Sequence, residues 1–106
     1  MTTAEFKRTA GKITAFTVEG HSGYGEAGED IVCASVSAVV WHTVHGLSEV
    51  GGIPVTYENR DGFVSCKIPC LSPEEREKAD LLLESMLAFL RELSGQYEQF
   101  VKVMEV

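Results

Sequence analysis

The sequence has few basic residues, and no short window concentrates them. Nine lysines and arginines stand against 16 aspartates and glutamates among 106 residues, which gives a formal net charge of −7. Phosphate contacts need clustered lysine and arginine, so this composition argues against direct nucleic-acid binding. An acidic surface is better suited to a basic protein or peptide partner, because opposite charges speed the encounter and improve its specificity.

From the sequence we also expect no disulfide framework, no leader and no membrane span. Three cysteines at irregular spacing are typical of a chain that acts in the reducing cytoplasm. Residues 1–11 contain no apolar run of the signal-peptide kind. No segment is expected to reach the roughly 18 apolar residues of a membrane span, so we expect no membrane partner.

No repeat, low-complexity tract or linker divides the chain, so residues 1–106 are expected to form one domain. Strands are predicted at 5–9, 13–19, 53–58, 62–69 and 98–106, with turns at 10–12 and 59–62. A helix is predicted from 30 to 50, where Gly51 and Gly52 end it. The second helix has Ser72 as N-cap, Pro73 as its first residue and Glu75 completing a capping box, and Gly95 is expected to end it.

The element order ββαββαβ predicts an α+β fold, a small mixed β-sheet with two helices packed on it. The first helix has so few polar positions that it is expected to be central and buried on most sides. Strand and helix periodicity predict a core made of Phe6, Phe16, Val18, Val32, Val36, Val39, Val40, Val44, Leu47, Leu82, Met86, Phe89, Leu90 and Leu93. Cys66 alternates with Val64 and Ile68, which indicates the buried face of a strand.

The residues from Gly20 to Ser37 carry the features of a cysteine nucleophile. His21 opens a glycine-rich loop, and Cys33 follows at the start of the first predicted helix. With Asp30 as N-cap, Cys33 would be the third helical residue, and its sulfur would point back toward the loop. The unpaired N–H groups of the helix start would then favour a thiolate and form an oxyanion hole.

Several assignments stay open from the residues alone. Asp30 could cap the helix, orient His21, or do both, and Ser37, one turn beyond Cys33, could bond near the pair or to its own backbone. A cysteine in an apolar helix is often a small core residue, and a loop histidine is often solvated. His42 and His45 have no carboxylate at matching spacing, and Cys66 and Cys70 have no second pair of ligands to complete a zinc site. We therefore expect no bound metal. Trp41 is expected in the core or an interface.

A second pattern, G-x-G-x-x-G, covers Gly23 to Gly28 and matches a dinucleotide-binding fingerprint. The acidic residues Glu26, Glu29 and Asp30 would repel a pyrophosphate there. The chain is also too short for the doubly wound sheet that normally carries this site. We therefore expect no nucleotide cofactor, although a nucleotide-binding module remains an alternative.

The residues from Gly20 to Ser37 resemble the signature of the bacterial ribosomal-processing cysteine proteases, often called Prp. That signature is Gly-His and a small residue, then Gly-x-Asp-Ile-Val-Cys-Ala and a serine one turn later. The matching residues are Gly20-His21-Ser22, then Gly28 through Ala34, and Ser37.

The resemblance implies a homodimeric α+β enzyme that removes a short N-terminal extension from the precursor of a large-subunit ribosomal protein. It implies a dyad of His21 and Cys33, with a substrate-binding loop that includes Gly20, Ser22, Gly23, Tyr24 and Gly28. A non-catalytic ribosome-assembly adaptor, in which the dyad serves only as core residues, is the other alternative.

Overall fold

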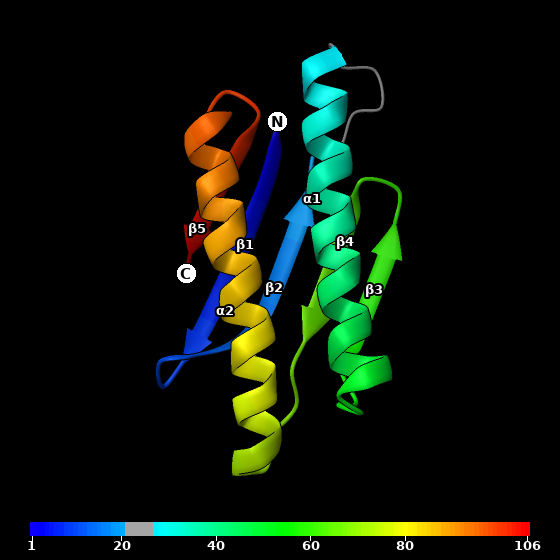
Figure 1. Ribbon diagram of the computed structural model, residues 1–106, viewed down its shortest axis with the longest axis vertical. Coiled ribbons are helices and arrows are strands. Elements are labelled where there is room, and N and C mark those ends of the chain that lie inside the picture. The colour runs from blue at the N-terminus through cyan, green and yellow to red at the C-terminus, as the bar shows by residue number, and fades with distance from the viewer. Residues whose placement is uncertain (21–26) are drawn as a thin grey trace.

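The computed structural model describes residues 1–20 and 27–106 and has the predicted element order ββαββαβ (Figure 1). Its elements are β1 (Thr2–Thr9), β2 (Lys12–Glu19), α1 (Ala27–His45), the π-helical turn η1 (Gly46–Val50), β3 (Thr56–Arg60), β4 (Phe63–Lys67), α2 (Pro73–Gln96) and β5 (Val101–Glu105). The predicted α+β fold is therefore confirmed.

The five strands form one mixed sheet in the order β3-β4-β2-β1-β5, in which only β1 and β5 are parallel neighbours. β1 begins at Thr2, three residues before the predicted start, because Thr2 pairs with Val101 and the strand lies between two partners. β5 is shorter than predicted, since the segment before it turns through a bond from the Phe100 N–H to the Tyr97 carbonyl. The earlier start of β1 thus depends on pairing across almost the whole chain, whereas the later start of β5 depends on a local turn.

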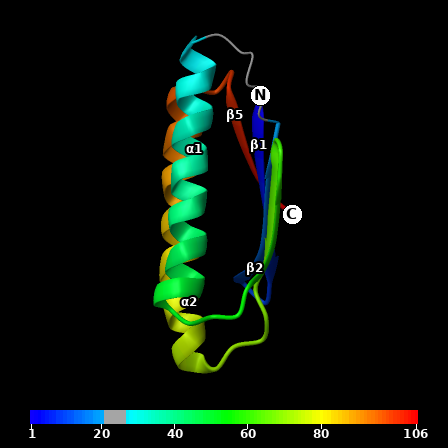
Figure 2. The ribbon, with the colours of Figure 1, turned by 90° about the vertical axis from the view of Figure 1, so that its right-hand side faces the viewer.

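Both helices pack on the same face of the sheet, and the described residues place no helix on the other face (Figure 2). α1 turns Val32, Val36, Val40 and Val44 into the core, whereas Ile31 on its outer side is 68% exposed. The expectation that this helix is buried on most sides is therefore wrong. Small and apolar residues are tolerated at the surface of a two-layer fold. The low number of polar residues in α1 therefore did not require that the whole helix be buried.

The segment Ile31–Val50 also corrects the expectation about membrane spans. Its 20 residues have a mean hydropathy of 1.4, which is long and apolar enough to cross a membrane by length and composition. Such a criterion is weak evidence, because a core helix satisfies it as well. Here the buried valines pack on the sheet, which explains the apolar composition.

The second hairpin is shifted relative to the prediction. β3 begins at Thr56 rather than at residue 53, because the Ile53 N–H donates to the Leu47 carbonyl and the buried Ile53 side chain closes the end of η1. The turn contains only Asp61 and Gly62, since Arg60 already pairs with Phe63. Gly62 has a φ of 72°, which favours glycine at this position.

The start of α2 is as predicted. Ser72 Oγ accepts the Glu75 N–H at 3.2 Å, and Glu75 Oε1 accepts the Ser72 N–H at 3.1 Å, which completes the capping box. The helix continues one residue past Gly95 to Gln96. Phe89 is 43% exposed, contrary to the prediction, because the buried stripe is centred on Leu83 and Leu90.

A network of ion pairs joins β1, α2 and β5. Arg8 donates to both carboxylate oxygens of Glu84, at 2.7 and 2.9 Å, and through Nε to Glu105 at 2.5 Å. Arg91 also donates to Glu105. The bonds from Arg8 lower the pKa of Glu84, and those from Arg8 and then Arg91 lower the pKa of Glu105.

We expect this network to make the protein acid-sensitive. Carboxylates with lowered pKa values stabilise the fold above the unfolded carboxyl pKa of about 4.3, and that stabilisation is lost as the pH falls through the folded value. The melting temperature of Glu84→Gln should lie below that of the unmodified protein at neutral pH, and the two should converge as the pH approaches about 3. A gap that stays constant with pH would contradict the role of the charge.

Candidate active site

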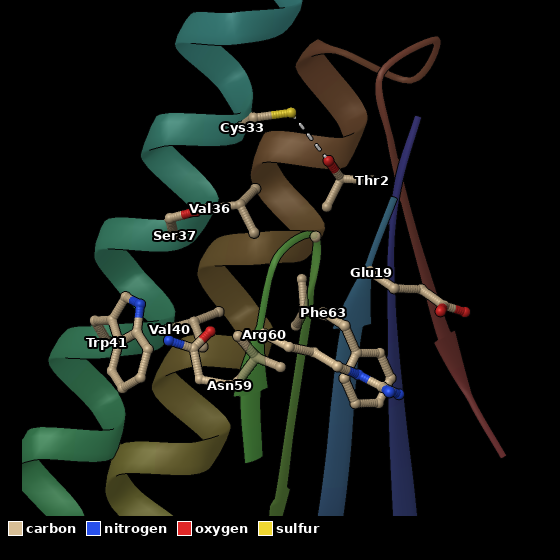
Figure 3. Close-up of a pocket in the computed structure, with 13 residues that line it drawn as sticks. Thr2, Glu19, Cys33, Val36, Ser37, Val40, Trp41, Asn59, Arg60 and Phe63 are labelled. Carbon is tan, nitrogen blue, oxygen red and sulfur yellow. Dashed lines mark hydrogen bonds between the residues drawn. The ribbon is translucent and has the colours of Figure 1, made fainter. Parts of the chain in front are cut away.

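A cleft of about 110 Å³ opens between α1 and the β3–β4 hairpin, at the end of the sheet where β2 finishes (Figure 3). α1 provides five of its lining residues, which are Cys33, Val36, Ser37, Val40 and Trp41. The strands provide Thr2, Val18, Glu19, Asn59, Arg60, Phe63 and Val64, and the hairpin turn provides Gly62. The wall is about equally polar and apolar, because valines and two aromatic rings alternate with hydroxyl, amide and charged groups.

The Cys33 side chain points from α1 toward Thr2 at the start of β1 (Figure 3). Its sulfur lies 3.2 Å from Thr2 Oγ1, and either atom could donate the hydrogen bond. Both residues are 3% exposed. Cys33 is thus a largely buried thiol at the cleft wall, with a polar partner that the sequence did not indicate because 31 positions separate the two.

The predicted role of Asp30 as N-cap is wrong. α1 begins at Ala27, so Asp30 is already the fourth helical residue and Cys33 the seventh. Alanine and glutamate propagate a helix well, and acidic residues in the first turn favour the positive end of its dipole. The unpaired N–H groups of the helix start therefore belong to residues 27–30, about one turn before Cys33.

Of the predicted loop residues, the structure describes Gly20 and the backbone of Gly28, which lies inside α1. His21, Ser22, Gly23 and Tyr24 lie outside the described residues, as does most of the G-x-G-x-x-G pattern.

Gly20 is tightly surrounded at the end of β2. Its N–H donates to the carbonyl of Gly62, a residue of the cleft, at 3.2 Å. Its φ is 105°, and a Cβ built on it would lie 2.1 Å from the Met1 carbonyl oxygen. Only glycine fits this conformation and this close approach, so the backbone fixes where the chain enters the loop that begins with His21.

Ser37 lines the cleft one turn beyond Cys33, in agreement with the prediction that the two share a face. Trp41, expected in the core or an interface, is partly buried and packs against the core. It also lines the cleft, edge-on to Tyr57 with ring centroids 5.8 Å apart. Nothing in the sequence indicated that Asn59 of β3 also lines the cleft. The spacing of residues 33, 37 and 41 on one helix face was a usable signal for Trp41, whereas only the fold could bring Asn59 there.

Two charged residues lie at the rim of the cleft. Glu19 is exposed at the end of β2, and the Arg60 guanidinium lies over the Phe63 ring at 4.4 Å from its centroid. Glu19 and Phe63 are register partners on neighbouring strands. The Glu19 carboxylate, the Arg60 guanidinium and the Phe63 ring therefore belong to adjacent positions of the sheet. Alternation along the strands places these three side chains opposite Val18 and Val64, on the sheet face away from α1.

The other two cysteines differ from Cys33 in their surroundings. Cys66 is buried in β4, as predicted, and burial raises the pKa of its thiol to about 11, which makes it unreactive at neutral pH. Cys70 is exposed and lies in the connection before α2. Of the three free thiols, only that of Cys33 lines the cleft.

The sequence model of one protein family, described as cysteine protease Prp, matches residues 1–102. The ribosomal processing cysteine protease Prp of Bacillus subtilis is 35% identical over 107 residues, which cover 97% of this chain and 96% of that protein.

Two crystal structures of an essential ribosomal processing protease Prp from Staphylococcus aureus are similar to the whole chain. The complex with a substrate peptide has a TM-score of 0.88 at 25% identity, with both chains covered completely. The complex with a covalently linked product peptide has a TM-score of 0.85 at 27% identity, again with complete coverage of both chains.

Proposed function

Because the chain belongs to the cysteine protease Prp family, a family of ribosomal-processing peptidases, we propose that Cys33 is its nucleophile and His21 its general base and acid. The substrate of the proposed reaction is the precursor of a large-subunit ribosomal protein, from which the enzyme removes a short N-terminal extension. The residues 1–106 act as a single protease domain.

The observation that carries the proposal is the position of Cys33 in the cleft. It combines with the peptide complexes of the S. aureus relatives, one of them covalent, to support attack by a thiol on a bound peptide. Support for His21 comes from its neighbour Gly20, which is bonded to Gly62 of the cleft. Gly20, the residue that precedes His21 in the sequence, therefore lies at the same end of the sheet as the cleft.

The reaction proceeds in two steps. His21 accepts the proton of the Cys33 thiol, and the sulfur attacks the scissile carbonyl carbon to form a tetrahedral intermediate. Collapse of this intermediate breaks the C–N bond while His21 protonates the leaving amine. Water then hydrolyses the thioester, which releases the extension and restores the thiol.

In this proposal Ser22, Gly23 and Tyr24 of the loop, together with Gly28 in the first turn of α1, contact the substrate. The net charge of −7 favours the approach of a basic ribosomal protein. All three cysteines are free, which fits action in the reducing cytoplasm. The homodimer implied by the family resemblance remains a prediction that sedimentation analysis would test.

Incubation with a precursor protein tests the function directly. The precursor of the large-subunit ribosomal protein that carries an N-terminal extension is expected to lose that extension in a single cut, read by the masses of both products. The same protein synthesised without its extension is the control and should stay intact. Survival of the precursor, or cuts scattered through both proteins, would contradict the assignment.

A further inference from the structure

We propose that Thr2 is a positioning residue for the Cys33 sulfur, holding it toward the cleft and favouring its ionised form through a hydrogen bond from the hydroxyl. This inference rests on the proposed function, in which Cys33 is the nucleophile. It begins from the 3.2 Å distance between Thr2 Oγ1 and Cys33 Sγ, between two residues that are each 3% exposed (Figure 3).

The backbone of Thr2 is fixed from two sides. Its N–H donates to the Phe100 carbonyl at 2.8 Å, and the residue pairs with Val101 of β5. On the other side, a Cβ built on Gly20 would lie 3.4 Å from the Thr2 Cα. Thr2 therefore neighbours two residues of the site. Its backbone lies beside Gly20, the residue before His21, and its hydroxyl lies beside the Cys33 sulfur.

The side chain of Thr2 is stiff as well. A β-branched residue in a strand has a restricted χ1 angle, so the position of the backbone largely decides where the hydroxyl points. Fixed backbone and restricted side chain together make Thr2 a preorganised hydrogen-bonding partner for the sulfur.

The direction of the hydrogen bond follows from the chemistry of the reacting state. In the neutral pair either the thiol or the hydroxyl can donate. A thiolate has no proton, so only the Thr2 hydroxyl can donate once Cys33 is ionised. Hydrogen bonds to a charged acceptor are stronger than those between neutral groups, so the bond favours the ionised sulfur over the neutral one.

The test compares Thr2→Val, which keeps the shape and removes the hydroxyl, with Thr2→Ser, which keeps the hydroxyl. The measurements are kcat/KM for the precursor and the rate of Cys33 alkylation by iodoacetamide across pH, followed by mass on the Cys33 peptide. At pH 7 we expect Thr2→Val to be about tenfold slower in both, the size of one charge-assisted hydrogen bond. At high pH, where every thiol is ionised, the alkylation rates should converge. Thr2→Ser should stay within about threefold of the unmodified protein.

Thr3→Val is the matched control, because Thr3 is the next residue of β1 and alternation along the strand places its side chain on the other face of the sheet. Its rates should not change. Should Thr2→Val fail to fold, Thr2→Ala removes the same hydroxyl without adding an atom and carries the same expectation. Circular dichroism and melting temperature identify the variants that are folded.

Three outcomes would overturn the inference. Unchanged rates in a folded Thr2→Val protein would make Thr2 merely structural, and faster alkylation would mean that the thiol donates to Thr2. A rate loss that is equal at every pH would separate Thr2 from the ionisation of the sulfur. Failure of the proposed function looks different, because the precursor would then be left intact by the unmodified protein or cleaved equally well by Cys33→Ala.

Discussion

Replacing Cys33 by alanine is expected to lower the rate of precursor cleavage by at least about 10⁴-fold, the usual loss when a covalent nucleophile is removed. The sulfur is the one atom in the proposed reaction that forms a bond to the substrate, and neither Cys66 nor Cys70 lines the cleft to replace it. The substitution removes one buried atom, so the melting temperature should change by only a few degrees, roughly the effect of 1 kcal/mol. Mass analysis of the products over a long incubation measures the residual rate.

The two other cysteines provide the matched controls. Cys70→Ala changes an exposed thiol and should leave both cleavage and melting temperature unchanged. Cys66→Ala removes a buried sulfur from β4 and should lower the melting temperature while the folded protein keeps its activity. Cleavage by a folded Cys33→Ala protein would show that another group attacks the substrate.

A variant of the proposed base separates the two members of the dyad. His21→Ala should reduce cleavage by about 10³-fold while Cys33 remains present for alkylation, because removal of a general base leaves the nucleophile in place. Equal cleavage by His21→Ala and the unmodified protein would leave Cys33 as nucleophile and remove His21 from the mechanism.

Substitution of Gly20 by alanine is expected to have the largest effect on stability. The new Cβ would meet the Met1 carbonyl oxygen at 2.1 Å, and the φ of 105° is one that side-chain-bearing residues rarely adopt. Both the end of β2 and the start of β1 must then shift, at a cost of more than about 2 kcal/mol, or a fall in melting temperature of roughly 10 °C. Cleavage should fall as well, since the shift reaches Thr2 and the chain that leads to His21. Thermal denaturation and the precursor assay below the melting point measure the two effects.

Gly52 allows strain and collision to be distinguished. It also has a positive φ, 67°, but a Cβ there would have no atom within 4 Å. Gly52→Ala should therefore cost only the backbone term, about 1 kcal/mol, and leave cleavage unchanged. If Gly20→Ala were no more destabilising than Gly52→Ala, the close approach to Met1 would not be an important constraint.

The local sequence determined most of the secondary structure. Ser72, Pro73 and Glu75 specify the start of α2 within four residues, and valines at helical spacing specify the core side of α1. These signals are readable because capping and periodicity involve neighbours in the chain. The start of β1 at residue 2 differs from the prediction because it depends on distant pairing, and the start of α1 at residue 27 because the helix propagates beyond its apolar stripe.

The candidate site shows the same division. Cys33 and Ser37 could be singled out from the sequence, since a helix places residues four apart on one face. That the sulfur meets Thr2, and that Asn59, Arg60 and Phe63 complete the cleft, follows only from the tertiary structure.

What the sequence determined by itself is the element order, the helix start at Ser72 and the residue types available for chemistry. The tertiary structure decided the strand order, the uncovered sheet face and the environment of the sulfur. The physical reason is the sequence separation of the interacting residues. Hydrogen bonds of caps and turns join residues a few positions apart. Strand pairing and side-chain packing join residues that only the folded chain brings together.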